Sequence, residues 1–155
     1  MRIRTTLATT VAALAIAVAP ALAAGHFVNA SATGPNAEGQ LFVSFKEAGL
    51  GNNQRIDYQA AAQASATYQC FNRGGNNPAA GNKTTVLQNV SATATFNSNK
   101  NGSVTGSITI DPPSAGTFTC PPGQRLVGPT EVSYTMVSIT DTTNGITENI
   151  PGTFS

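Results

Sequence analysis

Residues 54–70 read QRIDYQAAAQASATYQC, and this stretch decides the fold class. Every even position from Ile56 to Cys70 carries an apolar or aromatic side chain, whereas among the odd positions between them only Ala61 is apolar. This period of two is typical of a β-strand that faces a hydrophobic core on one side. Alanine also favours helices, but a helix would need apolar residues three and four positions apart. That spacing is absent, so the pattern predicts a strand.

The predicted strand is unusually long. At about 3.3 Å per residue its alternating part would span roughly 50 Å, which exceeds the strands of ordinary domains. We therefore expect a bend or bulge between Ala60 and Ala62, where the alternation is weakest. The core face of the strand is mostly alanine. Such small side chains predict a closely packed opposite sheet, or large side chains that reach across from it.

The first 23 residues have the three parts of a secretory signal peptide. Two arginines near the start precede an apolar run over residues 7–22, and Ala-Leu-Ala at 21–23 has the pattern of a signal-peptidase site. We expect cleavage after Ala23, with Ala24 as the alternative, and a single secreted, extracellular domain over residues 24–155. No second apolar run follows, so we expect no membrane segment after cleavage.

The composition of the mature region limits its partners. Without the two leader arginines it has six basic and seven acidic residues, so its net charge is near −1. This balance excludes a basic surface of the kind that binds nucleic acids. Most of the polar residues are Asn, Gln, Ser and Thr, and the length suits one domain with one core.

The chain has two cysteines, Cys70 and Cys120. An even number of cysteines in an exported chain predicts a disulfide. A redox-active pair would need a CxxC-like spacing or an activated thiolate, and the sequence offers neither. Because Cys70 shares the apolar face of its strand, we expect a buried, structural bond.

Turn-forming residues divide the remaining chain into further short strands. In the segment 131–140 the alternation changes phase, which predicts a bulge at Met136 and Val137 or a strand buried on both faces. Asn144-Gly145 is the strongest hairpin signal in the chain. The other strands are expected at residues 27–31, 40–46, 86–96, 104–110, 124–127 and 146–154, and a short segment at 117–120 carries the second cysteine.

Seven to nine short strands and no mature helix indicate an all-β fold. The prediction is an antiparallel β-sandwich, Greek-key and immunoglobulin-like, with one disulfide, and a β-barrel is the alternative. The chain has no tryptophan, so it lacks the residue that antibody domains pack on their disulfide.

The segment 96–106 predicts a specific hairpin. A three-residue loop at 100–102 with Gly102 in a left-handed conformation would pair Phe96 with Gly106 and put all apolar side chains on one face. A two-residue loop would place the two apolar faces on opposite sides. We therefore expect the three-residue loop.

The sequence shows no catalytic constellation, no metal site and no cofactor motif. His26 is the sole histidine and lies near the mature N-terminus, which argues against a Ser-His-Asp triad. No calcium-loop motif occurs, and Asp141 and Glu148 are the least poor calcium ligands. Two acids could in principle form a glycosidase pair. The acids are Glu38, Glu47, Asp57, Asp111, Glu131, Asp141 and Glu148.

Two loops rich in glycine and amide side chains, at 49–53 and 72–77, are the candidate binding loops. Their amides could bond a carbohydrate or an extracellular protein, and Phe71 lies off the core face of its strand. The candidate binding residues are Asn52, Asn53, Phe71, Asn72, Arg73, Asn76 and Asn77.

The mature chain resembles a group of small secreted proteins of actinobacterial type. The resemblance rests on GLGNNQRIDYQ at 49–59, TYQCFNRGG at 67–75, FTCPPGQ at 118–124 and DTTNGITENIPGTFS at 141–155. It implies no activity, ligand or residue role.

Three functions are consistent with the sequence. The first is a secreted, non-catalytic binding or cell-exterior interaction module. The second is a small carboxylate-dependent hydrolase with two acids about 5–10 Å apart in a cleft. The third is a secreted inhibitor that presents the loop from Phe71 to Pro78.

Overall fold

The computed structural model describes residues 24–74 and 82–155, and these form an all-β fold without an α-helix. The predicted leader and the candidates Asn76 and Asn77 lie outside the described residues. The strands are β1 (His26–Thr33), β2 (Leu41–Ala48), β3 (Arg55–Phe71), β4 (Lys83–Asn97), β5 (Val104–Ile110), β6 (Arg125–Val127), β7 (Val132–Asp141) and β8 (Ile146–Ile150).

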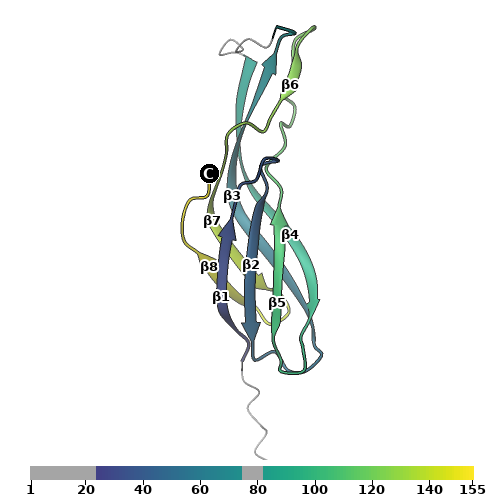
Figure 1. Ribbon diagram of the computed structural model, residues 1–155, viewed down its shortest axis with the longest axis vertical. Helices are drawn as coiled ribbons and strands as arrows, with labels where there is room; N and C mark the ends of the chain where they lie inside the picture. The colour runs from purple at the N-terminus through teal and green to yellow at the C-terminus, as the bar shows by residue number, and fades with distance from the viewer. Residues whose placement is uncertain (1–23, 75–81) are drawn as a thin grey trace, which may run out of the picture.

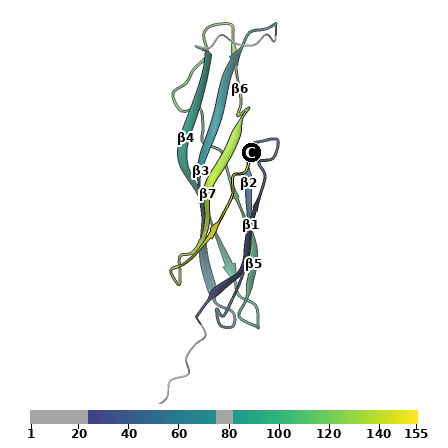
Figure 2. The same cartoon turned by 90° about the vertical axis from the view of Figure 1, so that its left-hand side faces the viewer.

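The strands form two antiparallel sheets, which confirms the predicted sandwich. One sheet has the order β1-β2-β5, and the other has the order β4-β3-β7-β8 with β6 also paired to β3. The two sheets lie face to face in the lower part of an elongated molecule (Figures 1 and 2). They stay open, so the alternative barrel is wrong. Above the three-stranded sheet, β3 and β4 continue and β6 joins them.

The alternation of the 54–70 stretch is confirmed in β3, where all eight even positions from Ile56 to Cys70 are buried. Large side chains from the facing sheet fill the space over its alanines, as the sequence predicts. Leu41, Val43 and Phe45 of β2 and Ile110 of β5 are among them. The rings of Phe45 and Tyr58 pack with centroids 4.5 Å apart.

Both predicted irregularities belong to one bulge between β3 and β7. The register shifts between Ala61 and Gln63 of β3, which pair with Ser138 and Thr135 of β7. The extra residue therefore belongs to β7, where Met136 adopts a left-handed φ of 52°. Because the bulge turns Met136 outward, its side chain is 77% exposed, and the phase change predicted in this strand is explained.

The predicted pairing of the segments around residues 100–102 is wrong, although the turn itself is confirmed. Gly102 N donates to Asn99 O at 3.0 Å, and Gly102 has a φ of 69°. The flanking strands then separate, since β4 pairs with β3 and β5 pairs with β2. Phe96 meets Gly106 across the core, where a Cβ on Gly106 would lie 2.8 Å from the ring. The alternation had indicated which faces are buried, but not which strands are neighbours.

The upper part of the inner face of β3 is covered by a loop, whereas the lower part packs against the other sheet. The connection from β5 to β6 crosses it, and Tyr68 Oη donates to Pro113 O at 2.6 Å. The predicted disulfide between Cys70 and Cys120 is confirmed, with a Cα–Cα distance of 5.5 Å, and it ties the connection to the end of β3. Cys70 is buried, as expected.

Candidate functional site

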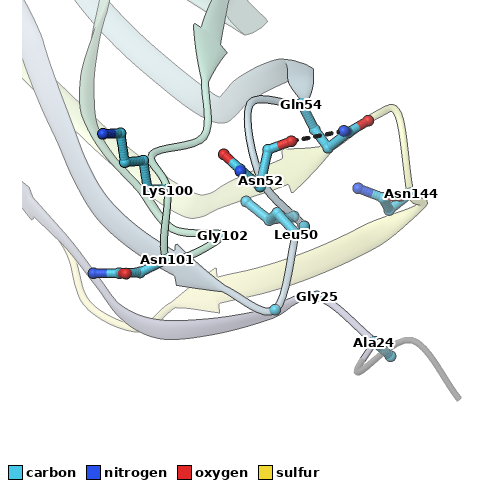
Figure 3. A pocket seen from close by; sticks show the side chains of 11 residues that line it. Ala24, Gly25, Leu50, Asn52, Gln54, Lys100, Asn101, Gly102 and Asn144 are labelled. Carbon is cyan, nitrogen blue, oxygen red and sulfur yellow. Dashed lines mark hydrogen bonds between the residues drawn. The ribbon is translucent and has the colours of Figure 1, made fainter. Parts of the chain in front are cut away.

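A cleft of about 840 Å³ opens at the lower end of the sandwich. It lies between three loops and the start of the described chain (Figure 3). The loop from β2 to β3, the loop from β4 to β5 and the turn from β7 to β8 all contribute to it. Its lining residues are Ala24, Gly25, Gly49, Leu50, Gly51, Asn52, Gln54, Lys100, Asn101, Gly102 and Asn144.

Hydrogen bonds hold the walls of this cleft in place. Leu50 N donates to Gly102 O at 2.9 Å, which joins the loop after β2 to the loop after β4. The buried hydroxyl of Ser98 donates to Gly51 O at 2.7 Å and accepts from Gln54 N at 2.8 Å. A site fixed in this way loses little conformational freedom when a ligand binds.

Two glycines allow these walls to approach each other. A Cβ on Gly102 would lie 3.0 Å from Gly51 N, and both glycines have left-handed φ angles, 69° and 77°. A side chain at either position would therefore strain the backbone, and at Gly102 it would also press on the neighbouring loop.

The lining of the cleft combines hydrogen-bonding groups with apolar surface. Asn52, Gln54 and Asn101 carry amides and Lys100 carries a positive charge, while Ala24 and Leu50 are apolar. The amide of Gln54 already donates to Asn52 O at 2.9 Å (Figure 3). Amides and ammonium groups bond hydroxyls, carbonyls and carboxylates. The arrangement therefore suits a polar ligand with several hydroxyl or amide groups.

Two carboxyl groups lie buried just inside the cleft. Glu47 of β2 and Asp141 at the end of β7 are both 0% exposed, and they face each other from the two sheets. Two of the seven acids therefore do meet, but Leu50 and Gly25 lie between Glu47 and the cleft. A buried pair of like charges is costly unless one member binds a proton or a cation compensates it.

Burial raises the pKa of Glu47 to about 6. Asp141 adds to this shift, whereas the hydrogen bond from Tyr58 opposes it. Tyr58 Oη donates to Glu47 Oε2 at 2.8 Å. Burial and the neighbouring Glu47 also raise the pKa of the Tyr58 hydroxyl, so Tyr58 remains a proton donor.

Asp141 has a different environment from Glu47. Its Oδ1 accepts from Thr143 N and Asn144 N, each at 2.9 Å, and its Oδ2 accepts from Asn144 Nδ2 at 2.6 Å. Three donors bind this carboxylate, whereas Glu47 accepts one hydrogen bond. Burial raises the pKa of Glu47, which therefore takes up a proton more readily than an ordinary carboxyl group. Through Asn144, the carboxylate also fixes the turn that lines the cleft.

The predicted binding residues lie at opposite ends of the molecule. Asn52 lines the lower cleft, and the neighbouring Asn53 is exposed with a left-handed φ of 52°. Phe71, Asn72 and Arg73 lie beyond the other end of β3, around a depression of about 270 Å³. Phe71 is half-buried and pairs with Arg125 of β6. The two candidate loops therefore do not form one site.

The buried acid pair was not predicted from the sequence, although both residues lie on the inward face of their strands. Glu47 has the same parity as Leu41, Val43 and Phe45, and Asp141 continues the inward parity of Val137 and Ile139 beyond the bulge. An acid on the core face of a strand is unusual. The calcium pair suggested by the sequence is not supported, because Asp141 is buried in its turn and Glu148 is exposed.

Among the described residues, no three His, Cys, Asp or Glu side chains gather as metal ligands would. Within the same residues no helix is long and apolar enough to cross a bilayer. The chain matches no protein-family model, and neither the curated proteins nor the solved structures include one that is significantly similar to it. The disulfide indicates that the chain folds in an oxidising environment.

Proposed function

We propose that this chain is an exported, non-catalytic β-sandwich whose lower cleft binds a polar extracellular ligand, a carbohydrate in the first instance. The supporting observation is the cleft itself, which loops from both sheets build and hydrogen bonds hold in place. Immunoglobulin-like sandwiches gather their binding loops at one end in a comparable way, and the likeness to them is part of this proposal.

The chemistry of the lining favours a carbohydrate. A sugar has many hydroxyls that both donate and accept, and side-chain amides can match both roles. The side-chain amide of Asn101 is exposed, while its backbone N–H, which donates to Asn99 Oδ1 at 2.9 Å, holds the loop. Lys100 adds a preference for sugars that carry a carboxylate, sulfate or phosphate group.

Export is supported by two independent features. The first 23 residues have the composition of a signal peptide, and the disulfide requires an oxidising compartment. Together they favour secretion, with the domain acting outside the cell.

The alternative functions receive less support. A catalytic acid must reach its substrate, whereas Glu47 and Asp141 are both fully buried, which argues against a carboxylate-dependent hydrolase. An inhibitory loop from Phe71 to Pro78 lies partly outside the described residues, and its described part is a shallow surface beside β6.

A glycan and cell-wall polymer binding screen on the purified mature chain tests this proposal. We expect saturable binding that Asn101→Ala weakens about tenfold, the loss expected for one or two good hydrogen bonds. Asn149→Ala is the matched control, because Asn149 is an exposed asparagine on β8 outside the cleft. Binding that Asn101→Ala leaves unchanged would overturn the assignment of the cleft. If the chain bound none of the polymers, a carbohydrate ligand would be excluded and protein partners would be tested next.

A further inference from the structure

The buried acid pair has an oxygen without a partner. Glu47 Oε2 accepts the hydrogen bond from Tyr58, but Glu47 Oε1 is fully buried and has no hydrogen-bond donor among the described residues. An unsatisfied buried carboxylate oxygen costs more than an unsatisfied neutral group. Glu47 Oε1 therefore lacks a hydrogen-bond donor, and the two acids lack a compensating positive charge.

The groups around Glu47 do not meet this need. On β3, Tyr58 gives one neutral hydrogen bond. On β7, Asp141 adds a second negative charge, and it can share a hydrogen bond with Glu47 only when one of the two carboxyl groups carries a proton. On β1, the imidazole of His26 attracts Glu47 weakly, and its residue is exposed. The cross-strand neighbours of Glu47 on β1 and β5 are the uncharged Phe27 and Val104.

The start of the described chain passes directly over the unpartnered oxygen. A Cβ placed on Gly25 would lie 2.9 Å from Glu47 Oε1, 3.0 Å from Leu50 Cδ2 and 3.2 Å from Ile146 Cδ1. Since backbone bonds are about 1.5 Å long, the Gly25 nitrogen lies within about 6 Å of Glu47 Oε1, and the Ala24 nitrogen, three bonds further along the chain, lies within about 10 Å. Opposite charges at such a separation attract each other, and here the carboxyl group is fully buried while Gly25 is half-buried and Ala24 is exposed.

We propose that the α-ammonium group created by removal of the leader, on Ala24 or Gly25, is the cation that pairs with Glu47 and Asp141. This inference rests on the proposed export, because before cleavage the same nitrogen is an uncharged amide. Hydrolysis of one peptide bond, with water as the co-reactant, leaves a carboxylate on the leader and an ammonium on the mature chain. Processing thereby supplies both a donor for Glu47 Oε1 and one positive charge for two acids.

The pairing would also complete the cleft. Ala24 and Gly25 both line the cleft, and a Cβ on Gly25 would lie 2.9 Å from Glu47 Oε1. An ammonium held at the acid pair would fix the residues before β1 against Leu50. The lower site would then take its final form only in the processed chain.

The stabilisation has a specific dependence on pH. The free ammonium helps only while Glu47 is ionised and the amine is protonated. The advantage of a free over a blocked N-terminus should therefore appear between about pH 5 and 9 and vanish outside that range.

The test compares the chain purified from the medium of a secretion host with its N-terminally acetylated derivative. Intact mass first gives the N-terminal residue. Acetylation at about pH 6.5 in denaturant spares the lysines, which stay protonated there, and the chain is refolded with its disulfide intact. Thermal melting is then followed from pH 4 to 10 for both forms, in the wild type, in Glu47→Gln and in the control Glu148→Gln.

We expect acetylation to lower the Tm at pH 7 by about 5 °C and to leave it unchanged at pH 4. Glu47→Gln should abolish this difference, and Glu148→Gln, which removes an exposed acid on β8, should preserve it. Equal melting of the free and acetylated wild type at pH 7 would overturn the pairing, as would a secreted chain that begins beyond Gly25.

These outcomes are separable from failure of the proposed function. Retention of the leader inside the cell would contradict export, and with it the processing step. A secreted, correctly cut chain with the predicted melting behaviour but without glycan binding would support the ion pair and contradict only the assigned ligand.

Discussion

The two halves of β3 have the same alternation in sequence but are buried by different means. In the lower half, Tyr58 lies against another sheet and packs with the rings of Phe27, Phe45 and Phe96, at centroid distances of 4.5–6.4 Å. In the upper half, Tyr68 lies under the irregular connection after β5. That connection is held by the hydrogen bond to Pro113 and by the disulfide of Cys70.

This difference shows what a pattern of apolar residues does and does not specify. Tyr58 in the lower half and Tyr68 in the upper half are both buried. The first is covered by regular packing, which needs no covalent help, whereas the second depends on a segment without strands that must be tied down. We infer that the lower half contains the stable core and the site, and that the upper half is an extension secured by the disulfide.

Loss of an aromatic ring from the lower core should have the largest effect. Phe45→Ala removes a side chain that is 2% exposed and contacts both Tyr58 and Phe96. We expect the free energy of unfolding to fall by about 3–5 kcal/mol. Urea denaturation followed by tyrosine fluorescence measures it. A loss below about 1 kcal/mol would show that the aromatic cluster is not the main source of stability.

Removal of the disulfide should have a smaller and local effect. The bond joins positions 50 residues apart. Cys70→Ser with Cys120→Ser should lower the free energy of unfolding by about 2–4 kcal/mol, since the unfolded chain loses its cross-link. We expect amide hydrogen exchange to accelerate in β6 and the connection before it, and to remain slow in β2. Equal acceleration in β2 would contradict the separation into two halves.

The effect of Glu47 titration on the free energy of unfolding should be smaller than the effect of removing the disulfide. Its pKa of about 6 in the folded chain is raised above the ordinary 4.5, so the folded chain binds the proton more tightly than the unfolded chain. In the chain without a free ammonium at its N-terminus, the contribution of Glu47 to stability is therefore largest below pH 4.5 and falls as the pH rises to 6, by up to about 2 kcal/mol.

In the N-acetylated chain, Glu47→Gln should remove this fall, whereas Glu148→Gln should keep it. Urea denaturation at pH 4.5 and pH 7 measures the difference. Parallel curves for the wild type and Glu47→Gln would show that Glu47 is not destabilised by its burial.

The smallest effect is expected at the bulge in β7. Met136 adopts a left-handed φ of 52° and is largely exposed, so glycine should relieve strain without loss of packing. We expect Met136→Gly to raise the free energy of unfolding by up to about 1 kcal/mol. Met136→Val, which is β-branched, should lower it. A Met136→Gly variant that melts below Met136→Val would contradict this explanation.

Much of the fold could be predicted because alternation reports directly which side chains are buried. It located β3, the bulge near Ala61 and Met136, and the inward position of Cys70. It could not distinguish neighbours within a sheet from partners across the core, and so the segment around Gly102 was assigned the wrong pairing. Which strands are neighbours depends on packing of the whole chain, which no local pattern contains.

The candidate site was less predictable. Asn52 was found from composition alone, but the cleft depends on the approach of three loops distant in sequence. The pairing of Glu47 with Asp141 could have been suspected, since both have the inward parity of their strands. Their meeting at one end of the core required the register of both sheets.

Binding by the chain without its disulfide tests the central claim most directly, namely that the lower end carries the site and the upper end is a structural extension. The measurement is the affinity of the Cys70→Ser, Cys120→Ser chain for the glycan found in the screen, with near-ultraviolet circular dichroism to verify the aromatic core. The account predicts an affinity within about twofold of the wild type. Loss of binding while the aromatic core remains intact would contradict it and would place the site at the end secured by the disulfide.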